Sequence, residues 1–143
     1  MTVKTVLSGK PPGVLTIAPD ETLAVAAKML AERRIGALVV LGPDQRVSGI
    51  LSERDIIHCF ATYGTAAFER RVEDAMTRKV VTCSQSDTVA SIMEQMTSGK
   101  FRHLPVLEQG RLIGIISIGD VVKYRLGEME REQNALKEYI LTA

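Results

Sequence analysis

The sequence predicts an α/β fold, of the mixed α+β type, built from two copies of a strand–helix–strand–strand–helix unit. A pseudo-two-fold axis relates the two copies, and a helical tail follows the second one. Three observations lead to this prediction. The length of 143 residues suits one compact domain, and the content of 45% hydrophobic and 24% charged residues is typical of globular proteins. The third observation is an internal duplication.

The duplication appears as residues that recur at a nearly constant spacing. In the first part of each copy the spacing is 66 positions, and after the loss of one turn residue it is 65. Because the register holds on both sides of a single deletion, divergence of a duplicated unit explains the pattern better than chance. The recurring pairs are Val14 and Val80, Thr16 and Thr82, Thr22 and Thr88, Leu38 and Leu104, Val40 and Val106, Gly49 and Gly114, Ser52 and Ser117, and Asp55 and Asp120.

Each copy carries the pattern of an amphipathic helix, two short strands and a further helix. Apolar residues at i, i+3, i+4 and i+7 predict the first helix. A turn joins the two strands, and the last helix begins near Asp55 in one copy and near Asp120 in the other. The apolar stripes are Leu23, Ala26, Ala27 and Leu30, then Val89, Ile92, Met93 and Met96, and the strands are 38–41 with 46–51 and 104–107 with 111–116.

We expect three segments along the chain. The first repeat, with an N-terminal lead-in, covers residues 1–71, the second covers 72–126, and the tail covers 127–143. In the tail, Met129, Leu136 and Ile140 form a sparse helical stripe. This stripe predicts a surface helix that docks on the body of the protein or on a second subunit.

Composition excludes several classes of function. A net charge of +1 lacks the basic excess that nucleic-acid binding needs, and only 4% of residues are aromatic, so no nucleic-acid partner is expected. Cys59 and Cys83 lie 24 positions apart without a CxxC pattern, which predicts reduced thiols and no metal site. Neither a signal-peptide core nor an apolar run near 18 residues is present, so we expect a soluble, cytoplasmic protein without a membrane partner.

The most informative motif is a duplicated Gly-x-x-Ser-x-x-Asp, at 49–55 and 114–120, where a predicted strand meets a predicted helix. Ser-x-x-Asp is the pattern of a helix capping box, which requires no ligand. The same helix start also suits a nucleotide, because its free N–H groups and the Ser hydroxyl can donate to phosphate. The Asp carboxylate can accept both hydroxyls of a ribose. Both interpretations stay open on the motif alone.

Together with this motif, four further stretches resemble a tandem pair of cystathionine β-synthase (CBS) domains, also called a Bateman module. The stretches are 20–23 (DETL), 35–40 (IGALVV), 72–77 (VEDAMT) and 101–106 (FRHLPV). The resemblance covers nearly the whole chain apart from the tail. It implies regulation rather than catalysis, through adenosine-containing ligands bound in clefts between the two repeats.

Carried over residue by residue, the resemblance implies a nucleotide site. Asp55 and Asp120 would hold ribose hydroxyls, and Ser52 and Ser117 would meet phosphate. Arg102 and His103 match the family's phosphate-contacting pair, and the base would lie against backbone and apolar groups. The full set of expected site residues is Leu15, Thr16, Ile35, Gly36, Ala37, Ser52, Arg54, Asp55, Val81, Phe101, Arg102, His103, Ser117 and Asp120. AMP is the first expected ligand, with ATP and NAD(H) as further candidates.

The two copies differ in charge. Arg54 is matched by Gly119 in the second copy, while Arg102 and His103 are matched by Gly36 and Ala37 in the first. We therefore expect the two clefts to bind the nucleotide with unequal affinity. In the extreme case one cleft is empty.

The leading hypothesis is a stand-alone regulatory CBS pair that reports energy or redox state to an unknown regulated protein. It includes a homodimer through the helices after Asp55 and Asp120, whose apolar residues exceed the needs of one buried face. The rival hypothesis is a ligand-free protein–protein interaction module in which Ser52 and Ser117 only cap helices. An enzyme acting on nucleotides is a third hypothesis, with His103 as the one candidate base; no catalytic residue, metal or catalytic cofactor is expected.

Overall fold

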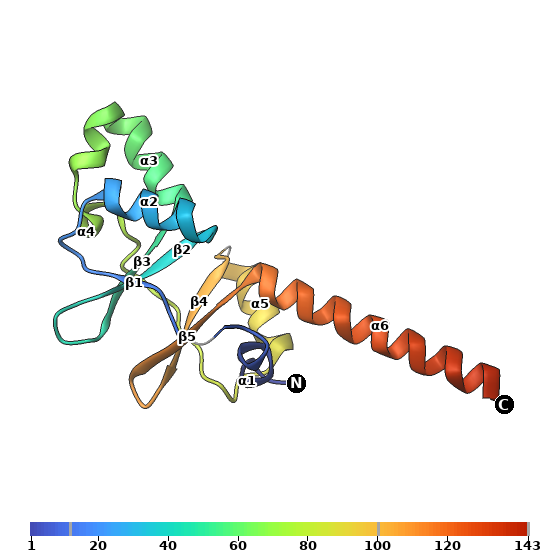
Figure 1. Ribbon diagram of the computed structural model, residues 1–143. Helices are drawn as coiled ribbons and strands as arrows, with labels where there is room; N and C mark the ends of the chain where they lie inside the picture. The colour runs from blue at the N-terminus through green and yellow to red at the C-terminus, as the bar shows by residue number, and fades with distance from the viewer. Residues whose placement is uncertain (12, 100, 143) are drawn as a thin grey trace.

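The computed structural model describes residues 1–11, 13–99 and 101–142. It forms two lobes, one for each repeat, and a long C-terminal helix that projects away from them (Figure 1). The first lobe contains β1 (Thr16–Ile17), α2 (Leu23–Arg33), β2 (Ala37–Leu41), β3 (Val47–Ser52), α3 (Glu53–Tyr63) and the 3-10 helix η1 (Gly64–Glu69). The second contains α1 (Val3–Ser8), α5 (Val89–Gly99), β4 (His103–Glu108), β5 (Arg111–Ser117) and the start of α6 (Ile118–Thr142), while α4 (Val72–Ala75) begins the linker.

Strand pairing repeats with the register of the duplication. β1 runs parallel to β2, and β2 runs antiparallel to β3. In the second lobe β4 and β5 form the same hairpin, and a single parallel bridge from Cys83 to Val106 stands in the place of β1. This bridge lies 66 positions after the Ile17–Val40 pair, and a register shift follows Val40 and Val106 alike. The predicted mixed α/β fold of two pseudo-symmetric repeats is therefore confirmed.

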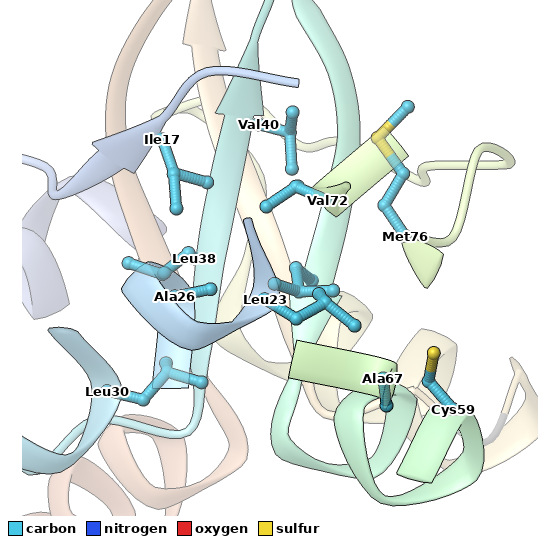
Figure 2. Close-up of a cluster of buried hydrophobic side chains, with 11 residues drawn as sticks. Ile17, Leu23, Ala26, Leu30, Leu38, Val40, Cys59, Ala67, Val72 and Met76 are labelled. Carbon is cyan, nitrogen blue, oxygen red and sulfur yellow. The ribbon is translucent and has the colours of Figure 1, made fainter. Parts of the chain in front are cut away.

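The first core forms where α2 packs on the first sheet. Thr22 caps α2, because its hydroxyl accepts the Val25 N–H at 3.3 Å, and the helix ends at Arg34 in the left-handed region at φ 52°. The predicted apolar stripe places Leu23, Ala26 and Leu30 inside this core. Figure 2 shows these side chains pointing toward Ile17, Leu38 and Val40 of the sheet, with Val72 and Met76 of the linker closing one side.

The second core repeats this packing with one correction to the predicted stripe of α5. Val89, Ile92 and Met96 are buried, but Met93 is 39% exposed and lies outside the core. Met93 occupies the i+4 position at the edge of the apolar stripe of α5. The sheet of the second repeat has only two strands, β4 and β5, among the described residues, and we attribute the exposure of this edge position to the narrow sheet. The counterpart of Met93, Ala27 in α2, is half-buried.

The lead-in helix α1 belongs spatially to the second repeat, where Val3 and Val6 enter the core (Figure 1). It docks as the linker docks on the first repeat: Val3 N–H donates to the Asp87 carbonyl at 2.9 Å, and Val72 N–H donates to the Glu21 carbonyl at 2.8 Å. The lead-in and the linker thus play equivalent roles. The division into residues 1–71, 72–126 and 127–143 follows the chain and stays a prediction.

The C-terminal tail is helical, as predicted, but it is continuous with the helix of the second repeat, and α6 spans 25 residues. The alternative that the tail docks on the body is wrong, because the helix leaves the body and its apolar residues are exposed (Figure 1). In the described part of the chain, no helix is long and apolar enough to cross a membrane.

Candidate functional site

A cleft of about 680 Å³ lies between the two repeats. The β3–α3 junction lines one side, the linker after α4 lines the floor, and the start of β4 with the β5–α6 junction lines the other side. This volume is within the range of small-molecule sites, which is about 300–1,000 Å³. The lining residues are Gly36, Ile50, Ser52, Glu53, Arg54, Asp55, Ile57, His58, Thr77, Lys79, Val80, Val81, Phe101, Arg102, His103, Ser117, Ile118 and Gly119.

The cleft brings together most of the residues expected from the sequence. Those that line it are Gly36, Ser52, Arg54, Asp55, Val81, Phe101, Arg102, His103 and Ser117. Leu15, Thr16, Ile35, Ala37 and Asp120 do not line it. Leu15 and Ile35 pack against the first core, Thr16 lies in β1, and Ala37 begins β2 in a buried position.

Several lining residues were not expected from the sequence, and the polar ones are Glu53 and His58 on α3 and Thr77 and Lys79 of the linker. Thr77 reaches the cleft because its backbone pairs with that of Ile50. The Thr77 N–H donates to the Ile50 carbonyl at 2.8 Å, and the Ile50 N–H donates to the Thr77 carbonyl at 3.0 Å. Lys79 follows two residues later. A linker without a periodic pattern gives no sequence signal for such pairing, although the doublet Arg78–Lys79 marked a basic segment.

Ser52 and Asp55 form a complete capping box at the start of α3. The Ser52 N–H donates to Asp55 Oδ2 at 2.9 Å, and the Asp55 N–H donates to Ser52 Oγ at 3.3 Å. The interpretation of this motif as a helix cap is therefore correct. The other carboxylate oxygen, Oδ1, accepts one long hydrogen bond, from the Thr77 hydroxyl at 3.4 Å in an exposed place, so it has a free lone pair for a further donor.

Basic side chains line the opposite side of the cleft from this carboxylate. Arg102 directly precedes β4 and His103 begins it, and two further cations line the cleft elsewhere: Arg54 beside Asp55 on α3, and Lys79 in the linker. Burial lowers the pKa of His103, against the opposing influence of Asp120 and Glu53, so its imidazole is neutral at physiological pH. The His103 ring lies 3.4 Å from the place where a side chain on Gly36 would begin, so the two repeats approach each other closely at this point of the cleft.

Apolar side chains complete the cleft. Three of them are well exposed to solvent: Ile57 by 66%, Val81 by 44% and Ile118 by 43%. Phe101 is half-buried. A flat apolar group placed between these side chains would cover them and gain favourable burial.

The second motif has the same cap but a different partner. The Ser117 N–H donates to Asp120 Oδ2 at 2.9 Å, and the Asp120 N–H donates to Ser117 Oγ at 3.1 Å. The Lys10 ammonium lies 2.7 Å from the same carboxylate oxygen. Burial by itself would raise the pKa of Asp120, but hydrogen bonds from Lys10 and Ser117 outweigh it and hold the pKa below its usual value.

Comparison with known proteins assigns the family. The CBS domain model matches residues 7–62 and 72–127, so the chain belongs to the CBS domain family and carries two such domains in tandem. A CBS-domain-containing protein of Agrobacterium tumefaciens has 48% sequence identity and a TM-score of 0.84, over 87% of this chain and 92% of that one. CBS-pair proteins of this kind are regulatory modules.

Two further relatives bear on ligand and length. The CBS domain pair of protein MJ0100, with a TM-score of 0.77 and 27% identity over 90% of this chain and 98% of its own, was solved with 5′-methylthioadenosine and S-adenosyl-L-methionine. A mitochondrial CBS domain-containing protein of Arabidopsis thaliana is 35% identical over 125 residues, which are 85% of this chain and 61% of the plant protein. This chain thus spans about three fifths of that relative's length.

Proposed function

We propose that the cleft between the repeats binds an adenosine nucleotide and that the bound state is transmitted to another protein. The observation that carries this proposal is the Asp55 carboxylate of the first repeat and the pair Arg102 and His103 of the second in one cleft of small-molecule size, which Glu53 also lines. A nucleotide carries a diol and a phosphate on one ribose, and this cleft offers a carboxylate acceptor for the diol and a cationic group for the phosphate.

Each part of the ligand has a candidate contact. The ribose hydroxyls donate to Asp55, whose Oδ1 is the less engaged oxygen. The phosphate meets Ser52 at the start of α3 and the side chains of Arg102 and neutral His103, which donates through a ring N–H. The adenine lies between Val81 and Phe101, where it covers exposed apolar surface.

A ligand in this cleft would contact both repeats and the linker at once. Its binding free energy would then favour one arrangement of the lobes over others, which is the requirement for a signal. AMP stays the first proposed ligand, with ATP and NAD(H) as alternatives, and the protein is proposed to act through a partner rather than as an enzyme. The cytoplasmic location stays a prediction, since one relative is named mitochondrial.

A thermal-melt series tests the binding proposal with AMP, ATP, NAD, NADH and S-adenosylmethionine, and with GMP as the control for the base. A ligand at 100 times its dissociation constant adds about 2.7 kcal/mol to the free energy of unfolding. We expect a raised melting temperature with at least one adenine ligand and none with GMP. Equal shifts with GMP, or no shift with any ligand, would contradict the proposal.

The proposed assembly is a homodimer through α3 and the start of α6. Ile57 and Phe60 on α3, with Val122 and Leu126 on α6, are 66%, 44%, 48% and 57% exposed, although all four are large and apolar. Such a surface favours an interface with a second copy. A mass measurement by light scattering at micromolar concentration tests this, and a monomer mass would contradict it.

A ligand-free interaction module is the second candidate function. The observation in its favour is that Ser52 with Asp55 and Ser117 with Asp120 each make both hydrogen bonds of a capping box, a structural role that accounts for the motif by itself. Under this alternative the cleft residues act only in stability, and the thermal-melt series shows no response to any nucleotide.

A further inference from the structure

Lys10 connects the lead-in to the second copy of the Gly-x-x-Ser-x-x-Asp motif. Its ammonium donates to Asp120 Oδ2 at 2.7 Å and to the Ile115 carbonyl at 2.8 Å. Both side chains are partly buried, with 31% of Lys10 and 23% of Asp120 exposed. An ammonium with two acceptors in a partly buried place is held more firmly than a surface ion pair.

The first copy has a lysine two residues after Thr77, Lys79, but among the described residues this lysine forms no ion pair with Asp55, and the two connecting segments differ in length. In the lead-in, Leu7 lies against Gly114, and in the linker, Met76 lies against the equivalent Gly49. Leu7 and Met76 are therefore counterparts, and so are the residues that follow them, Ser8 and Thr77. From Thr77 to Val80 two residues intervene, but from Ser8 to Val14, the counterpart of Val80, five residues intervene. The longer segment carries Lys10.

We infer that Lys10 is an internal latch that keeps the Asp120 motif from binding nucleotide, so that the two motifs of the protein are unequal. This inference rests on the proposed function, since it assigns to Asp120 the ribose contact proposed for Asp55. A ribose diol needs both carboxylate oxygens. At Asp55 these oxygens accept only from neutral donors, Ser52 and the Thr77 hydroxyl. At Asp120 one oxygen accepts from Ser117 and also from the charged Lys10 ammonium, which neutralises the carboxylate. The ammonium must leave before a ribose can bind, and its release costs free energy that lowers the apparent affinity.

Removal of the latch should therefore create a second binding event. Lys10→Met removes the ammonium and keeps most of the aliphatic stem, and hydrogen bonds to charged groups of this kind correspond to roughly 10- to 100-fold in affinity. Lys4→Met is the matched control, because Lys4 is an exposed lysine of the same lead-in, on α1. Lys10→Met combined with Asp120→Asn removes both the latch and the carboxylate.

Isothermal titration with AMP, and in parallel with S-adenosylmethionine, measures the number of sites. We expect one equivalent for the wild type and for Lys4→Met, two for Lys10→Met, and one again for the double variant. One equivalent for Lys10→Met, or two for the wild type, would overturn the latch and leave the proposed function standing. Binding to Lys10→Met alone would support the latch but contradict the proposed role of Asp55. No binding of either probe by any variant overturns both.

A second inference rests on a different feature, the spacing of residues along the exposed part of α6. Apolar residues recur there at alternating steps of four and three positions, which is the seam of a coiled coil. All five apolar members are exposed by 48–63%, and one polar residue interrupts the series. The seam consists of Val122, Leu126, Met129, Gln133, Leu136 and Ile140.

The charges beside the seam distinguish the possible partners. In a parallel pair of identical helices, a residue beside the seam faces the residue five positions later in the second copy. Arg125 then faces Glu130 of the second copy, and Glu132 faces Lys137 of the second copy. In the antiparallel pairing of the same apolar residues, Glu130 faces Glu130 and Lys123 faces Lys137. The first arrangement pairs opposite charges and the second pairs like charges.

From this charge complementarity we infer that the occupant of the α6 seam is a second copy of this chain, in a parallel, in-register coiled coil. The inference goes beyond the proposed dimer face because it fixes the direction of the helices. It also assigns a role to the polar Gln133, since one polar residue in a seam favours a single register at some cost in stability.

Disulfide formation tests the direction of the helices. Ile140→Cys places two thiols opposite each other in the parallel pair and about 27 Å apart in the antiparallel one, at 1.5 Å per residue over 18 positions. We expect a rapid cross-linked dimer with Ile140→Cys, and little with Glu138→Cys on the outer face. Glu132→Lys should weaken the dimer roughly two- to twentyfold, and Glu132→Lys with Lys137→Glu should restore it. Equal cross-linking of the two cysteine variants, or a monomer mass for the full chain, would overturn the inference.

Discussion

Replacement of Asp55 by Asn separates the capping role of this residue from its proposed role in binding. Asparagine keeps an oxygen that can accept the Ser52 N–H, which Asp55 Oδ2 accepts at 2.9 Å. The change removes the negative charge at the N-terminus of α3, which stabilises a helix by about 0.3–1 kcal/mol, and weakens a charge-assisted hydrogen bond. We expect the free energy of unfolding to fall by about 1 kcal/mol.

The expected loss of nucleotide affinity is larger. A hydrogen bond to a charged group contributes about 1.5–3 kcal/mol and one between neutral groups about 0.5–1.5 kcal/mol. In the variant both ribose hydroxyls donate to a neutral amide in place of a carboxylate. The binding free energy of AMP then weakens by about 2 kcal/mol, which raises its dissociation constant roughly 30-fold. Calorimetric titration measures the affinity, and urea unfolding measures the stability.

Asp120→Asn is the matched control, because it removes the equivalent charge at the other capping box. It loses the ion pair with Lys10, so its stability should fall by a similar amount, but AMP affinity should stay within about twofold of the wild type. If the two variants weaken AMP equally, or if Asp55→Asn leaves the affinity unchanged while stability falls, Asp55 acts only as a cap and the reasoning is refuted.

Three further predictions follow from burial and charge. Burial, with a smaller effect of Asp87, raises the pKa of Cys83 to about 12, so thiol reagents at pH 8 should label Cys83 only in urea; rapid labelling of the native protein would contradict this. Leu38→Ala and its counterpart Leu104→Ala remove fully buried side chains and should each lower the free energy of unfolding by about 2–5 kcal/mol, while a loss under about 1 kcal/mol would contradict the two cores. Because burial lowers the folded-state pKa of His103, the unfolded chain binds the proton more readily, and stability should fall as pH drops below about 6.5. His103→Gln should flatten this part of the stability curve; an unchanged slope would show that other groups produce it.

The elements that were predictable are those with local or repeated signals. The Ser52 and Asp55 motif appears twice with the same spacing, and each copy forms the same capping box. The helix stripes were predictable because a period of 3.6 residues depends only on the local chain. Met93 departed from its stripe because burial at an edge position depends on the width of the sheet below it, which no local pattern encodes.

The features that were not predictable depend on contacts between distant segments. Lys10 and Asp120 are 110 positions apart, and an ion pair between them has no periodicity to reveal it. Thr77 enters the cleft through a backbone pairing with Ile50, which side-chain patterns do not record. The sequence did show that the two copies differ in charge, but the charges it compared were Arg54, Arg102 and His103, and the lead-in lysine was not among them.

The central claim is that the cleft between the repeats binds an adenosine nucleotide. A titration of the isotopically labelled protein with AMP, followed by amide and side-chain NMR shifts, tests it most directly. The account predicts saturable shifts concentrated at Asp55, Thr77 and Phe101 to His103, with small changes around Asp120 while Lys10 holds it. Saturable shifts confined to residues outside the cleft, or no shifts at millimolar AMP and its adenine analogues, would contradict it.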